Sequence, residues 1–148
     1  MKKEVLISEL IRSGVCEDGE IKGASAEDVM ALSKHAGISF PSAYIEFLLA
    51  VGDGAGEFLR GVDVFLSAIR DLNEEAVNIL IENAEGFTLP SGAFVFLMHQ
   101  GYEFDYFVAS EGSDPPVYQY VEGNGRPLRV WNSFSDFLRQ SIGSHAKT

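Results

Sequence analysis

The chain has 148 residues and a formal net charge of −11, from 22 acidic and 11 basic side chains. This excess repels nucleic-acid phosphates and anionic lipid headgroups, so we expect neither a nucleic acid nor a membrane as a partner. A basic protein is the partner that the charge favours, although a negative charge also serves solubility alone.

Apolar residues make up 46% of the chain, enough for one aromatic-rich core in a single domain spanning residues 1–148. Cys16 is the one cysteine, so no internal disulfide forms. The N-terminus has no signal-peptide apolar run, and no stretch approaches the roughly 18 apolar residues of a membrane span. These features predict a cytoplasmic protein and leave its oligomeric state open.

The first third of the chain predicts three helices. The first runs from Glu4 to Ser13, and the second begins at a Ser25 cap and ends at Gly37. The third begins at Phe40-Pro41 and is apolar over most of its circumference, which predicts a central, largely buried helix. A flexible turn at 52–56 and two short strands, at 57–59 and 62–66, are expected to follow.

Residues 71–85 form the clearest amphipathic pattern. Apolar residues share one side of the predicted helix: Ala76, Val77, Leu80, Ile81 and Ala84. Acidic residues share the other: Asp71, Glu74, Glu75, Glu82 and Glu85. Gly86 stands where a left-handed C-terminal cap is expected.

The second half predicts a meander of antiparallel strands and a closing helix. The expected strands cover residues 93–98, 102–108, 117–121 and 128–131. Ser133 is expected to cap the last helix. Helices followed by a meander and a final helix predict an α+β fold, with an antiparallel sheet flanked by helices.

Four local patterns together resemble one family. They are Phe40-Pro41-x-x-Tyr44-x-x-Phe47-Leu48, the hairpin from Phe96 to Phe107, Asp114-Pro115-Pro116-Val117-Tyr118, and Ser133-Phe134-Ser135-Asp136-Phe137-Leu138. They look like segments of the SUKH superfamily and span about Val29 to Ile142. The family often has an Asn-Gly-Gly turn after its helix opening, where this chain has Gly52-Asp53-Gly54.

The resemblance implies an α+β sheet with flanking helices and no catalytic apparatus. The superfamily is similar to a fungal regulator of cell-wall assembly. Many of its bacterial members are immunity proteins that neutralise toxins of contact-dependent or polymorphic toxin systems. Members bind diverse toxins, so the resemblance transfers no binding residue and identifies no partner.

The acidic stripe of the predicted 71–85 helix is the first candidate site. Carboxylates near a helix N-terminus are favoured by the macrodipole, whereas Glu82 and Glu85 near the C-terminus are disfavoured. Nothing in helix stability calls for those two, so the stripe is a candidate surface for a basic groove, such as a nuclease toxin uses to hold phosphates. An ordinary solvated helix face remains the alternative.

Glu103 and Asp105 are the second candidate, because residues two apart on a strand point to the same face. Paired carboxylates at this spacing also occur in glycosidases, but the sequence indicates no sugar cleft. Tyr102, Phe104 and Tyr106 lie on the opposite side, which we expect to be the core side. The pair is therefore interpreted as a polar face that is able to contact a partner.

No other pattern indicates chemistry. His99 stands at the hairpin turn without metal-ligand spacing to another histidine or to Cys16, so we expect a structural role, with its ring nitrogens bonded to turn backbone or to a carboxylate. No metal, cofactor or catalytic residue is predicted. The leading hypothesis is an immunity-type protein that binds a cognate toxin. A housekeeping regulator or scaffold is the alternative, and a hydrolase using Glu103 and Asp105 is a third.

Overall fold

The computed structural model describes residues 1–146 and has the predicted α+β architecture. The helices are α1 (Lys3–Arg12), α2 (Ala26–Ala36), α3 (Ser42–Val51), α4 (Leu72–Glu82) and α5 (Phe134–Ala146), with short 3-10 turns η1 (Asp18–Glu20) and η2 (Ala109–Glu111). Ser25 caps α2 by accepting a hydrogen bond from the Asp28 amide (3.1 Å), as predicted. None of the helices in these residues is both long and apolar enough to cross a bilayer.

The main sheet is an antiparallel meander in the order β3-β4-β5-β6. Its strands are β3 (Ala93–His99), β4 (Glu103–Val108), β5 (Val117–Val121) and β6 (Leu128–Trp131), close to the predicted ranges. A second, two-stranded sheet pairs β1 (Ile21–Lys22) with β2 (Gly54–Ala55). β2 lies inside the segment expected to be only a flexible turn.

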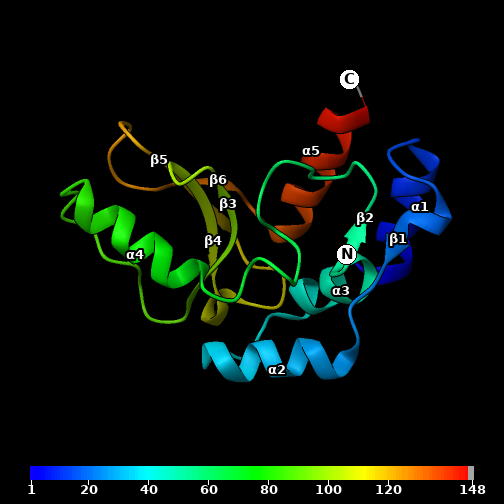
Figure 1. Cartoon of the computed structure of the whole chain (residues 1–148), viewed down its shortest axis with the longest axis horizontal. Coiled ribbons are helices and arrows are strands. Elements are labelled where there is room, and N and C mark those ends of the chain that lie inside the picture. Colours follow the sequence, from blue (N-terminus) through cyan, green and yellow to red (C-terminus); the bar gives the residue numbers. More distant parts are fainter. Residues whose placement is uncertain (147–148) are drawn as a thin grey trace.

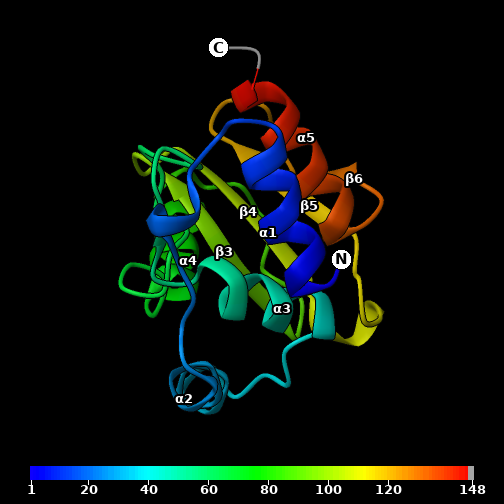
Figure 2. The same ribbon diagram turned by 90° about the vertical axis from the view of Figure 1, so that its right-hand side faces the viewer.

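The helices cover both faces of the main sheet. In Figure 1, α4 lies on one side of the strands, and α3, α5 and α1 lie on the other. Figure 2 shows α1 and α5 in front of the strands and α4 behind them. Both faces of the sheet are therefore buried over much of their area. Of these helices, α4 is the one that covers its own face of the sheet.

An aromatic core fills the space between the sheet and α3. The Tyr44 ring lies at its centre, 5.0 Å from the Phe107 ring and 5.5 Å from the Phe134 ring, centroid to centroid. Tyr44 is fully buried, and its hydroxyl has no hydrogen-bond partner among the described residues. The prediction of a central, buried third helix is confirmed.

On the opposite face, α4 packs on β3. Ala76 and Leu80 are buried there. The Asn73 side chain holds the edge of β3, because its amide donates to the Ala93 carbonyl (2.9 Å) and its oxygen accepts from the Val95 amide (2.6 Å). This side chain stands in for a strand partner and fixes the start of α4 against the sheet.

The strands expected at 57–59 and 62–66 are wrong. This segment consists of turns, apart from one isolated bridge between Asp63 and Met98. Leu59 and Gly61 adopt positive φ values of 54° and 93°, which interrupt an extended chain. The apolar residues in the run are nevertheless used, because Phe58 and Val64 are fully buried anchors of the loop.

Candidate binding surface

Most of the predicted acidic stripe lies on the outer surface of α4. Glu74, Glu75 and Glu82 are exposed and form no ion pair or side-chain hydrogen bond with any residue in the range 1–146. The helix carries no basic residue. Three carboxylates of α4 are therefore free to meet positive charge on another molecule.

The two ends of the stripe already have partners. Asp71 precedes α4 as its N-cap residue, and its carboxylate lies 3.9 Å from Nε2 of His35 in α2. Glu85 lies beyond the end of the helix and accepts a hydrogen bond from the Tyr120 hydroxyl. Fold stability therefore accounts for Glu85, which the sequence suggested it did not, and only Glu82 is left without a structural role near this end.

An apolar hollow of about 450 Å³ adjoins the acidic stripe. It lies between the apolar side of α4 and the returning segment Gly86–Leu89. Val77 is 42% exposed and Ile81 is 71% exposed, so this part of the apolar side predicted for the helix faces solvent instead of the core. The amphipathic prediction is correct for Ala76 and Leu80 and incomplete for these two residues.

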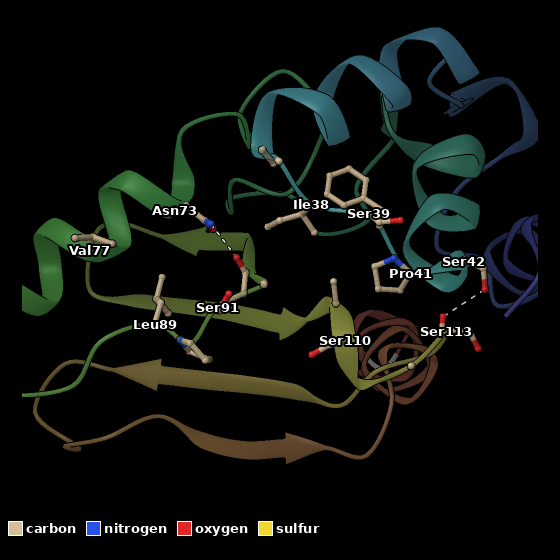
Figure 3. Close-up of a pocket in the computed structure, with 18 residues that line it drawn as sticks. Ile38, Ser39, Pro41, Ser42, Asn73, Val77, Leu89, Ser91, Ser110 and Ser113 are labelled. Atoms are coloured by element: carbon tan, nitrogen blue, oxygen red, sulfur yellow. Dashed lines mark hydrogen bonds between the residues drawn. The ribbon is translucent and has the colours of Figure 1, made fainter.

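A second cavity, of about 840 Å³, lies farther along the chain that returns after α4, where Leu89, Pro90, Ser91 and Gly92 are among its lining residues (Figure 3). Five serines gather in its lining: Ser39, Ser42, Ser91, Ser110 and Ser113. No charged side chain is among the described lining residues, so this cleft offers hydroxyl and backbone hydrogen bonds and no acid–base group. Val77 and Leu89 line both cavities, so the two cavities are neighbours.

Glu103 and Asp105 lie on β4, and the expected outward polar face is wrong for Asp105. Asp105 is 2% exposed, because its side of the strand also carries Phe107, which belongs to the aromatic core beneath α3 and α5. Phe104 and Tyr106, on the side expected to be the core, are buried beneath α4's face of the sheet. Both sides of β4 are therefore core sides.

Gln119 of β5 joins the two carboxyl groups. Its side-chain amide donates to Glu103 (3.1 Å) and to Asp105 (3.0 Å). Burial raises the pKa of Asp105 to about 7, with Gln119 opposing the rise and Glu103 adding to it. Because Asp105 is enclosed, its carboxyl cannot reach a partner or a substrate in this conformation.

His99 has the expected carboxylate nearby and also a neighbouring hydroxyl that was not expected. Nδ1 of His99 lies 3.2 Å from the Tyr102 hydroxyl and 3.8 Å from the Glu103 carboxylate. Cys16 is buried, and burial followed by the charge of Glu20 raises the pKa of its thiol. Among residues 1–146, no group of three or more His, Cys, Asp or Glu side chains is arranged to hold a metal ion.

Sequence reasoning found the acids of α4 but missed the hollow and the cleft beside them. The hollow depends on the return of the chain after α4, where Ala84 and Gly86 adopt positive φ values of 51° and 66°. The left-handed residue that follows the end of α4 is Ala84, not Gly86 as expected, although Gly86 is also left-handed within the reversal. The serines of the cleft come from segments distant in the sequence, so no local pattern joined them.

Comparison with known proteins agrees with the resemblance in the helix opening, the hairpin and the last helix. The chain matches the model of the SMI1 / KNR4 family (SUKH-1) over residues 23–140, which include the whole of the main sheet and most of the helices. A search of curated proteins gave no match. Because the family match covers most of its length, the chain belongs to the SMI1 / KNR4 family (SUKH-1).

Proposed function

We propose that this chain is a non-catalytic binding protein of the immunity type, which covers a basic surface of a cognate toxin with α4. The observation that supports this most is the set of unpaired carboxylates Glu74, Glu75 and Glu82 on a helix without a basic residue. Such a surface complements a groove lined with Lys and Arg, the kind of groove by which a nuclease holds phosphates.

Two further observations support binding over catalysis. The carboxyl pair that suggested a hydrolase is partly enclosed, since Asp105 is 2% exposed and hydrogen-bonded to Gln119. A hydrolytic pair needs both carboxyl groups open to the substrate. The SMI1 / KNR4 family, moreover, includes toxin immunity proteins.

The test compares two variants that lose the same charge from different places. One carries Glu74→Gln, Glu75→Gln and Glu82→Gln, all on α4. The control carries Glu4→Gln, Glu27→Gln and Glu122→Gln, which are exposed acids on other parts of the chain. The partner is first isolated by its capture on the unaltered chain from a lysate of the native cells. Each variant is then mixed with this partner, and association rates are measured in 20 mM and in 300 mM NaCl.

We expect the α4 variant to associate about tenfold more slowly than the unaltered chain in 20 mM NaCl, and the control to change much less. The difference should shrink in 300 mM NaCl, where screening weakens long-range attraction. When co-expressed with the toxin, the unaltered chain and the control should protect cells better than the α4 variant does. Equal capture and equal protection by the two variants would contradict the proposal.

A further inference from the structure

The apolar hollow beside α4 exposes large apolar side chains, which an ordinary solvated helix face does not need. Ile81 is 71% exposed and Val77 42% exposed, and they stand one helical turn apart on the same side of the helix. The returning segment supplies the opposite wall, in which Phe87 is half-buried. The hollow of about 450 Å³ has room for the side chain of one large apolar residue.

One acidic residue of α4 that is unpaired within residues 1–146, Glu74, lies beside this hollow. Glu74 precedes Val77 by three residues and Ile81 by seven, so all three project along neighbouring rows of the helix. Glu82 is also exposed, but it points about 100° away from Ile81 around the helix and is not among the described residues that line the hollow. The Arg126 guanidinium lies 5.4 Å from the Phe87 ring centroid, although Arg126 is not among the residues of the described chain that line the hollow.

The charge beside the hollow selects the occupant. A second copy of this chain would bring the same unpaired carboxylates against these, and both copies carry a net charge of −11. Such a contact is repulsive. A segment with a Lys or Arg next to an apolar residue suits Glu74 and the hollow together, since its cation meets Glu74 while its apolar side chain leaves water.

We propose that the hollow between α4 and Phe87–Leu89 seats an apolar anchor residue of a basic segment in the partner protein. This inference rests on the proposed function and adds the residue that holds the partner after charge has brought it in. Electrostatic attraction sets the rate of encounter, whereas a desolvated apolar anchor slows dissociation. The anchor contact, unlike the charge contact, should persist at high salt.

The test uses two synthetic peptides labelled with fluorescein. The first has the sequence Lys-Arg-Gly-Lys-Phe-Leu-Lys-Gly-Arg-Lys, and the second has serine in place of phenylalanine and leucine. Binding is measured by fluorescence anisotropy to the full chain, to Ile81→Ser, and to Met30→Ser as the control. Met30 lies on α2 and is 73% exposed, so the control removes an equally exposed apolar side chain from another surface.

We expect the first peptide to bind the full chain and the Met30→Ser variant alike, and the Ile81→Ser variant about tenfold more weakly. The serine peptide should bind weakly and equally to all three. Amide resonances of residues 77–89 should shift with the first peptide in a two-dimensional NMR titration. Equal loss of affinity in Ile81→Ser and Met30→Ser, or no advantage of the first peptide, would overturn the inference.

The outcomes separate this inference from the proposed function. One outcome is that both peptides bind equally well and both lose affinity for the Glu74→Gln, Glu75→Gln and Glu82→Gln variant. That result would support binding by the acidic surface of α4 and overturn the apolar anchor. If neither peptide binds, the charge complementarity behind both proposals fails. Self-association that Ile81→Ser abolishes, measured by sedimentation, would assign the hollow to a second copy and overturn the basic-partner assignment.

Discussion

Asp105 gives the fold a dependence on pH that the surface carboxylates do not share. Its pKa rises from 3.8 to about 7 because the carboxyl is buried. Between these values the folded chain holds a proton that the unfolded chain has lost, so stability falls as pH rises from about 4 to about 7. The full effect is on the order of 4 kcal/mol. Below this window the contribution is complete, and above it the contribution is lost.

We expect Asp105→Asn to flatten this dependence. The amide oxygen still accepts the hydrogen bond from Gln119, but the side chain no longer ionises. The free energy of unfolding should therefore rise by a few kcal/mol at pH 8 and change little at pH 4. Urea unfolding at several pH values measures this, with exposed Asp53→Asn as the control. An unchanged slope between pH 4 and pH 7 in Asp105→Asn would show that another group titrates.

Tyr44 and Tyr120 are both fully buried, but their hydroxyl groups differ in hydrogen bonding. The Tyr44 hydroxyl has no partner among residues 1–146, whereas the Tyr120 hydroxyl accepts from Asn83 (2.9 Å) and donates to Glu85. A buried hydroxyl without a hydrogen bond costs about 1–3 kcal/mol. Removing it with Tyr44→Phe keeps the ring contacts and should stabilise the chain by about 1 kcal/mol.

Tyr120→Phe is the counterpart and should destabilise the chain by about 1–3 kcal/mol, because it leaves Asn83 and Glu85 without their partner. Thermal unfolding of both variants at one pH compares them directly. The same sign of change in the two variants would contradict the hydrogen-bond argument.

At the scale of elements, the strand β1 depends on one glycine. A Cβ atom at Gly23 would lie 1.9 Å from the Leu49 carbonyl oxygen, so only glycine lets the segment after β1 run against α3. The adjacent amide of Ala24 donates to the Leu48 carbonyl (2.9 Å). We expect Gly23→Ala to destabilise the chain by about 1–3 kcal/mol or more.

Gly19→Ala is the matched control, because a Cβ at Gly19 meets nothing within 4 Å. Its effect should stay within about 0.5 kcal/mol. Chemical unfolding of both variants measures the difference. Equal stability would mean that β1 and α3 move apart without cost.

The elements predicted best from the sequence are those whose pattern is long or has clear ends. The four strands of the meander and the capped helix α2 follow this rule, since turn residues and a serine cap mark their limits. The strands expected at 57–59 and 62–66 failed because short apolar runs also anchor loops, as Phe58 and Val64 do. Pattern alone does not distinguish an anchored loop from a strand.

The site was harder to predict than the fold, because exposure depends on the whole molecule. The sequence identified the acids of α4, but the arrangement of the sheet decided that Asp105 is enclosed and that Ile81 is open to solvent. Helical spacing places Ile81 and Leu80 on one apolar side, but Leu80 is buried where α4 packs on β3, whereas Ile81 is 71% exposed. A site formed by two segments such as 77–81 and 86–89 is predictable only when the fold that brings them together is known.

At the scale of the whole molecule, net charge and local charge make different predictions. A charge of −11 repels itself within the folded chain, so stability at pH 8 should rise as NaCl increases from 20 to 300 mM. The α4 variant (Glu74→Gln, Glu75→Gln, Glu82→Gln) and the scattered variant (Glu4→Gln, Glu27→Gln, Glu122→Gln) each remove three charges. Both should weaken this salt response of stability to a similar degree.

Association with a basic partner should instead separate the same two variants. Self-repulsion sums over all charges, whereas encounter with a groove is governed by the charges that face it. Thermal unfolding and stopped-flow association, carried out on one set of samples over the same salt range, give both responses. A scattered variant that slows association as much as the α4 variant would mean that total charge alone directs encounter, and that α4 has no privileged part in it.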